Sequence, residues 1–87
     1  MPEISRFFGL VIYMYFKNHA PPHFHAVYGN YEAQVSIETG YIISGEFPKK
    51  QERLVEAWAE IHKEELLTNY LEMQKDEPIV RKIKPLM

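Results

Sequence analysis

The segment HFHAVYGNYEAQVSIE, residues 23–38, decides the fold of this chain. Two runs of alternating side chains flank Gly29-Asn30, a two-residue turn with glycine first, which is typical of a type II′ β-hairpin. This turn fixes a register in which His25 faces Gln34, and facing residues share a side of the sheet. The apolar side then consists of Phe24, Ala26, Tyr28, Tyr31, Ala33, Val35 and Ile37. The polar side consists of His23, His25, Glu32, Gln34, Ser36 and Glu38.

Further strands are predicted on both sides of this hairpin. Residues 7–16 are mostly aliphatic and aromatic, which favours a strand, and residues 17–22 form the loop that follows. One face of this strand would carry Leu10, Ile12, Met14 and Phe16. The other face would carry Val11, Tyr13 and Tyr15. Thr39-Gly40 is a second turn signal, and residues 41–47 are predicted as a strand.

The spacing of apolar residues changes from that of a strand to that of a helix after Pro48, and a proline suits the start of a helix. No glycine or proline follows until Pro78, and helix-forming residues are frequent. Two apolar stripes, rotated from each other, occur in this region: Leu54, Trp58 and Ile61, then Leu66, Leu67, Tyr70 and Leu71. The polar residues between them predict a kink or a break near residues 62–65. Trp58 is expected to anchor the core.

Together these elements predict a single two-layer α+β domain over residues 1–87. An antiparallel meander of about four strands would occupy residues 1–47, and one kinked or two short helices over residues 48–77 would cover one face. Residues 78–87 would form an edge strand or a loose basic tail.

Composition excludes several classes of protein. Apolar residues at 46% and charged residues at 25% indicate a globular chain, and the absence of cysteine excludes a disulfide framework or a zinc–thiolate site. No secretory leader is recognised, and the longest apolar run is too short to cross a bilayer. We therefore expect a cytoplasmic protein without a membrane partner. The net charge of −2 gives no general attraction to phosphate.

Three of the four histidines lie in HAPPHFHA, residues 19–26. Pro21 and Pro22 restrict the backbone, so the chain should enter His23 extended. His23 and His25 then project to the same face of the sheet, away from the helix-covered core.

Three interpretations of this polar face stay open. The first is a solvated sheet face whose histidines cap the loop or hydrogen-bond neighbours. The second is a divalent-metal site, and the third is an acid–base or phosphate-contacting site on RNA. The candidate metal ligands are His19, His23, His25 and Glu38, with Glu32 as another acidic neighbour. The candidate catalytic residues are His23, His25 and Tyr15. The candidate binding residues are Tyr13, Tyr15, Gln34, Arg81, Lys82 and Lys84.

Four segments carry a resemblance to a known family: ISRFFG (4–9), MYF (14–16), HAPPHFHA (19–26) and WAEIHKEEL (58–66). Over nearly the whole length, the chain resembles the bacterial domain-of-unknown-function 4160 family. The resemblance implies a small stand-alone protein encoded beside another small domain, similar to toxin–antitoxin pairs. It supplies no catalytic residues, but His19, His23, His25 and His62 stand at matching positions.

The leading functional hypothesis is therefore a component of a toxin–antitoxin-like module that binds a small protein partner and acts on RNA. The alternatives are a divalent-metal-binding protein that uses His23 and His25, and a non-catalytic interaction module, for which homodimerisation is one expectation.

Overall fold

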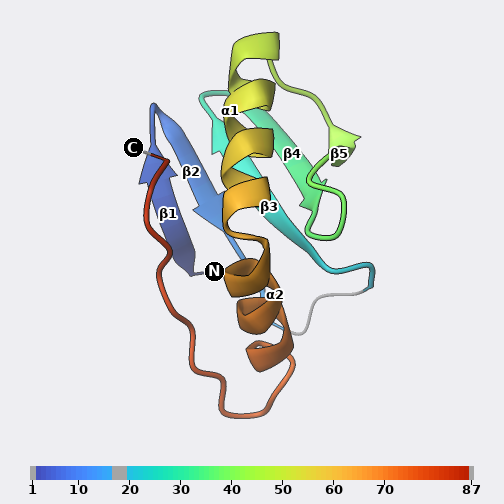
Figure 1. Cartoon of the computed structure of the whole chain (residues 1–87), viewed down its shortest axis with the longest axis vertical. Helices are drawn as coiled ribbons and strands as arrows, with labels where there is room; N and C mark the ends of the chain where they lie inside the picture. Colours follow the sequence, from blue (N-terminus) through green and yellow to red (C-terminus); the bar gives the residue numbers. More distant parts are fainter. Residues whose placement is uncertain (1, 17–19, 87) are drawn as a thin grey trace.

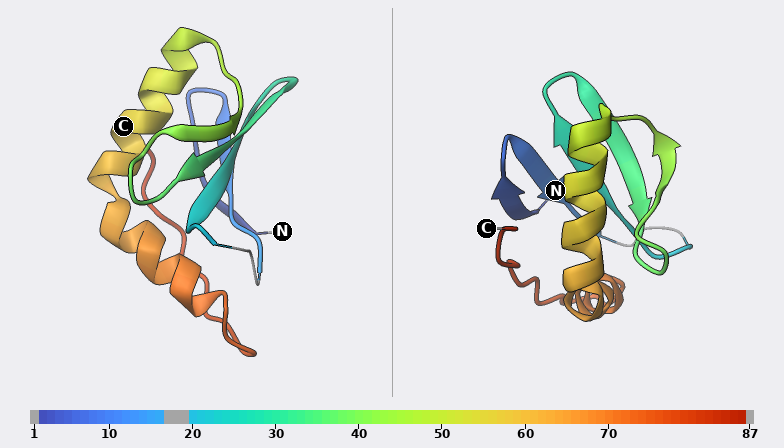
Figure 2. Two further views of the ribbon diagram at one scale, coloured as in Figure 1. Left: turned by 90° about the vertical axis from the view of Figure 1, so that its right-hand side faces the viewer. Right: turned by 45° about the horizontal axis from the view of Figure 1, so that its top comes forward.

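The computed structural model describes residues 2–16 and 20–86 and has two layers, a five-stranded antiparallel sheet and a helical layer on one of its faces (Figures 1 and 2). The strands follow one another across the sheet in the order of the sequence. This is the α+β meander that the sequence predicts. The elements are β1 (Glu3–Phe7), β2 (Leu10–Tyr13), β3 (His23–Tyr28), β4 (Tyr31–Ser36), β5 (Ile42–Gly45), α1 (Lys49–Ile61) and α2 (Lys63–Glu72).

The central hairpin has the predicted register. His25 pairs with Gln34, and the pairing runs without interruption from His23 and Ser36 to the residues that flank the turn. Gly29 has a φ of 56°, as the first central position of a type II′ turn requires. The fully buried side chains of β3 and β4 lie on the helical side, as the alternation indicates.

The first predicted strand, residues 7–16, is partly correct: β2 lies within it, but the range also holds the last residue of β1 and a turn. Phe8-Gly9 is this turn between β1 and β2, and both of its residues have positive φ, 49° and 79°. An aromatic residue is unusual at the first of these positions, so the sequence carries no clear signal for the turn. Leu10 and its alternate neighbours are buried as predicted, but Phe16 is exposed.

The two remaining strands are shorter than predicted. The strand expected over residues 31–38 ends at Ser36, because Ile37 to Thr39 form a turn in which the Ser36 carbonyl accepts a hydrogen bond from Gly40 N. β5 covers only part of residues 41–47 and pairs with β4 through an irregularity. This turn carries Glu38 off the polar side to which the alternation assigned it.

The helical layer divides at His62, within the interval where the break was predicted. Trp58 is fully buried, as expected, and its ring contacts the rings of Phe7 and Phe24. The predicted stripes are only partly correct. Ile61, Leu67 and Leu71 are exposed, because the buried residues form other stripes at helical spacing and leave these three on the opposite side of each helix.

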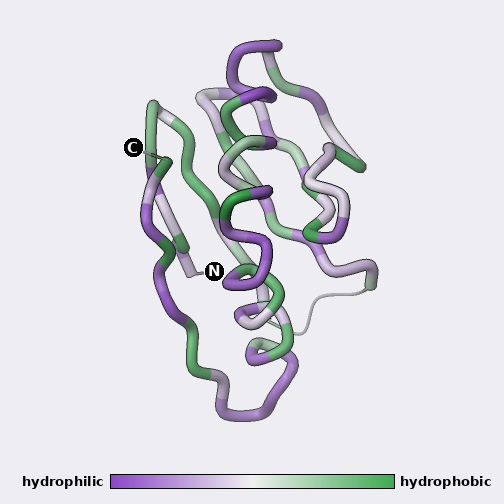
Figure 3. Tube along the Cα trace, in the orientation of Figure 1, coloured by the Kyte–Doolittle hydropathy of each residue, from purple (hydrophilic) through white to green (hydrophobic). Residues whose placement is uncertain are grey.

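The C-terminal segment is neither an edge strand nor a loose tail. It runs back beside β1 without regular structure (Figure 1), with alternating hydrophobic and hydrophilic residues (Figure 3). Ile83 is buried, and its N–H donates to the Ile4 carbonyl. Trp58 Nε1 donates to the Lys84 carbonyl at 2.8 Å, and the Asn69 amide bonds both backbone groups of Arg81. These contacts fasten the segment to the core.

Candidate functional site

His23 and His25 lie at the start of β3 on the sheet face that the helices leave uncovered. Their ring centroids are 5.2 Å apart. Both residues are buried, with 8% and 9% of their surfaces exposed. These two side chains are therefore largely shielded from solvent, although they lie on the polar face of the sheet. One reason is Tyr15, whose ring meets the His25 ring edge-on at 4.2 Å.

A backbone carbonyl sets the proton positions on His23. Its Nδ1 lies 2.8 Å from the Pro21 oxygen. Because a carbonyl oxygen only accepts hydrogen bonds, Nδ1 carries a proton and donates it. In the neutral ring, Nε2 is then the basic atom. The Pro21-Pro22 segment thus positions the histidine next to it.

His25 is held in a less polar environment. Its Nδ1 is shielded from solvent and has no hydrogen-bond partner, and the nearest carboxylate oxygen, from Glu32, is 3.7 Å away. Burial, followed by the neighbouring His23, lowers the pKa of His25 below its ordinary value. The imidazole is therefore neutral near pH 7 and able to accept a proton. Neither His23 nor His25 has a partner for Nε2 among the described residues.

Other predicted residues join the pair. Tyr13 and Gln34 are the register partners of His25 on either side, so all three share one face. Burial, together with Glu32 and Tyr13, raises the pKa of Tyr15, so its hydroxyl stays protonated near neutral pH. The face therefore offers proton donors and acceptors next to the two imidazoles.

Several candidates lie elsewhere. His19 falls outside the described residues. Within the described part of the chain, no three histidine or acidic side chains form a group that could hold a metal ion. The cations Arg81, Lys82 and Lys84 are exposed on the C-terminal segment, which packs against the helical layer and β1 rather than beside the histidines. His62 contacts Glu65 at the helix break, with Nδ1 2.6 Å from the carboxylate.

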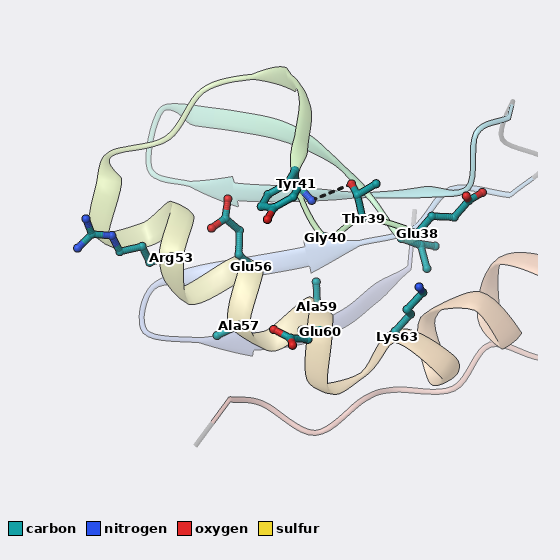
Figure 4. A pocket seen from close by; sticks show the side chains of 11 residues that line it. Glu38, Thr39, Gly40, Tyr41, Arg53, Glu56, Ala57, Ala59, Glu60 and Lys63 are labelled. Atoms are coloured by element: carbon teal, nitrogen blue, oxygen red, sulfur yellow. Dashed lines mark hydrogen bonds between the residues drawn. The ribbon is translucent and has the colours of Figure 1, made fainter.

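Glu38 lines a cavity of about 520 Å³ between the turn after β4 and the outer side of α1. Figure 4 shows Glu38 and Tyr41 on the side of the turn after β4, facing Glu56, Glu60 and Lys63 on the helical side. Burial and the neighbouring Glu52 raise the pKa of Glu56, another residue of this wall. This cavity has no signal in the sequence, because its residues meet only through the tertiary fold.

Comparison with known proteins gives one match. The family model described as "Domain of unknown function (DUF4160)" matches residues 9–70, which include β2 to β5, α1 and most of α2. No curated protein matches the chain, and no solved structure does. No helix among the described residues is long and apolar enough to cross a membrane.

Proposed function

The chain belongs to the DUF4160 family, and we propose that it is the RNA-directed component of a toxin–antitoxin-like module, in which His23 and His25 exchange protons with the substrate. The observation that carries this proposal is the pair of imidazoles 5.2 Å apart on the uncovered sheet face. Side chains that transfer protons near neutral pH are few, and histidine is the commonest of them.

The two histidines suit different roles. His25 has a lowered pKa and is neutral, so it acts as the base. His23 donates through Nδ1 to the Pro21 carbonyl, which leaves Nε2 as the atom that faces the substrate, so His23 acts as the acid through Nε2. Tyr15 packs on His25 and holds its ring.

The reaction that fits such a pair is transesterification of RNA. The base takes the proton of a ribose 2′-hydroxyl, whose oxygen attacks the adjacent phosphorus. The bond from phosphorus to the 5′-oxygen breaks, and the acid gives its proton to that oxygen. The products are a 2′,3′-cyclic phosphate and a 5′-hydroxyl, so no co-reactant is needed. Arg81, Lys82 and Lys84 would contact phosphates further along the strand, which makes binding depend on salt.

A small protein partner is the second part of this proposal. β5 is an edge strand of the sheet, and Ile43 within it and Tyr41 just before it are exposed. An extended segment of a partner adds to such an edge through backbone hydrogen bonds. The partner would then silence the protein by binding β5 and extending over the histidine face.

Growth and RNA cleavage test the proposal together. The wild-type chain, when expressed alone, should arrest growth, and the purified protein should cleave single-stranded RNA in EDTA. His23→Ala and His25→Ala should lose both effects by at least tenfold while their circular dichroism stays native. His62→Ala is the matched control, because this histidine lies at the helix break, and it should keep full activity. Cleavage that survives both substitutions would contradict the proposal, and a wild-type chain without any effect would favour an interaction module.

The unpartnered Nδ1 of His25 favours one other candidate, divalent-metal binding. Imidazole nitrogen suits zinc, copper and nickel, and His23 with His25 would supply two ligands. Calorimetric titration with zinc should then show micromolar or tighter binding that weakens at least tenfold in His25→Ala. Absence of heat with the wild type would exclude this candidate.

A further inference from the structure

A second cavity, of about 340 Å³, lies at the opposite end of β3 from the histidines. It is lined by Phe8 from the β1–β2 turn, by Tyr28 at the end of β3, and by Lys50, Gln51 and Leu54 from the first turns of α1. Tyr28 is five residues from His23, which is roughly 16 Å along an extended strand. The two sites are therefore separate.

The Gln51 side chain is mostly buried, with 9% of the residue surface exposed, but its amide atoms keep contact with solvent. The amide forms no hydrogen bond to any described residue. Its amide borders the cavity and is available to a ligand that offers both a donor and an acceptor.

Phe8 adds an aromatic surface at a conformational cost. Its φ of 49° lies in the left-handed region, where a bulky residue is an outlier, and its side chain is 52% exposed. Strain of this kind clusters at functional sites. Gly9 allows the close approach of the second ring, since a Cβ there would lie 3.1 Å from Tyr28 Cε1.

The remaining wall is positively charged. Lys50 lines the cavity, and Lys49 precedes it in the first turn of α1. Pro48, at the N-cap, forms no side-chain hydrogen bond to the helix. The first N–H groups of the helix therefore stay available for an anion, and the helix dipole favours one there. Glu52 is the acidic residue of this turn and does not line the cavity.

We propose that this cavity binds a nucleotide. The nucleobase stacks on the rings of Phe8 and Tyr28, and the Gln51 amide bonds its edge. Glutamine pairs in this bidentate way with adenine, which makes adenine the favoured base. The phosphate is held by Lys50 and the start of α1. The same chemistry is presented by a free nucleotide and by a nucleotide within single-stranded RNA, and the site does not depend on the histidines.

Calorimetric titration with adenosine 5′-monophosphate, with adenosine and with an oligoadenylate of six nucleotides tests this inference. Phe8→Ala and Gln51→Leu should each weaken binding of the monophosphate at least fivefold, because base stacking and amide pairing are lost. Lys50→Gln should weaken binding of the monophosphate but not of adenosine. Tyr41→Ala, which removes an exposed ring at another cavity, is the control and should leave binding unchanged, as should His25→Ala.

The affinities for the oligoadenylate and for the monophosphate show whether the cavity binds RNA or a free nucleotide. The comparison is made in His25→Ala, so that RNA bound at the histidine face is weakened. Binding of the oligoadenylate at least tenfold tighter than the monophosphate, with loss of that binding when Phe8→Asn is added, assigns the cavity to RNA. Equal or weaker binding assigns it to a free nucleotide. Phe8→Asn guards against loss of folding, because asparagine suits the backbone of this turn and yet removes the ring. Failure of all three ligands to bind at millimolar concentration would overturn the inference. Unchanged binding in both Phe8→Asn and Gln51→Leu would do so as well.

Discussion

Two substitutions at Phe8 should separate the cost of its backbone from the contribution of its ring. Asparagine and alanine both remove the ring, which meets Phe7 edge-on at 6.5 Å. They differ in how well they tolerate a φ of 49°, because asparagine is enriched in the left-handed region and alanine is not. The difference in unfolding free energy between Phe8→Asn and Phe8→Ala therefore measures the backbone strain.

The expected magnitudes follow from exposure and φ. Full burial of a phenylalanine stabilises by about 1.5–3 kcal/mol, and Phe8 is 52% exposed, so loss of the ring costs roughly 1 kcal/mol. A left-handed conformation costs about 1–2 kcal/mol for an ordinary residue. Phe8→Ala should thus destabilise by about 1 kcal/mol, while the relief of strain leaves Phe8→Asn close to the wild type.

Urea denaturation followed by fluorescence is a direct assay, because Trp58 is the single tryptophan and is fully buried. The gap between the two variants should be about 1 kcal/mol, or roughly 4–8 °C in melting temperature for a domain of this size. Equal destabilisation of both variants would refute the argument that Phe8 is strained.

Three further predictions concern stability. Because burial lowers the pKa of His25, the unfolded chain binds a proton below about pH 6.5 that the folded chain resists. Unfolding free energy should therefore fall as the pH drops from 7 to 5, and a series of melts should show a smaller fall in His25→Leu. Trp58→Ala should cost about 3–5 kcal/mol in a urea titration, and a loss below about 1 kcal/mol would mean that the ring is not part of the core. Gly45→Ala would press its Cβ against the Glu32 carbonyl and should cost more than about 2 kcal/mol, whereas Gly29→Ala, in open space, should cost about 1 kcal/mol in the same melts.

The central hairpin was predictable because local chemistry and tertiary packing agree there. Gly29-Asn30 is a strong turn signal, and the alternation on both sides fits only one register. The break near His62 was predictable for a related reason, because two rotated apolar stripes cannot both face one core from a straight helix. The exposure of Ile61 was not predictable, because the buried stripe of α1 runs through Val55, Trp58 and Ala59, and the sequence alone does not tell which of two adjacent stripes faces the sheet.

The histidine site was predictable in position but not in environment. The period of a strand places His23 and His25 on one face, but the burial of His25 depends in part on Tyr15, a residue beyond the end of β2. The proton position on His23 depends on the Pro21 carbonyl, whose location relative to the ring the sequence does not reveal. The predicted place of Glu38 on the polar face is wrong, because the strand alternation does not continue through the turn after Ser36.

The two tight turns at one end of the sheet differ in how well their residues suit the backbone. Gly29-Asn30 obeys the rules of turn chemistry, and it specifies a register and nothing more. Phe8-Gly9 has a phenylalanine at a position of positive φ, where asparagine is favoured. Local rules in proteins are broken mainly where function requires it. The Phe8 ring borders the same cavity as the unpartnered amide of Gln51 and the ammonium group of Lys50. Binding of a ligand in this cavity would explain why a phenylalanine is retained at an unfavourable backbone position. A turn that misleads a sequence-based prediction is therefore the feature that points to a binding site.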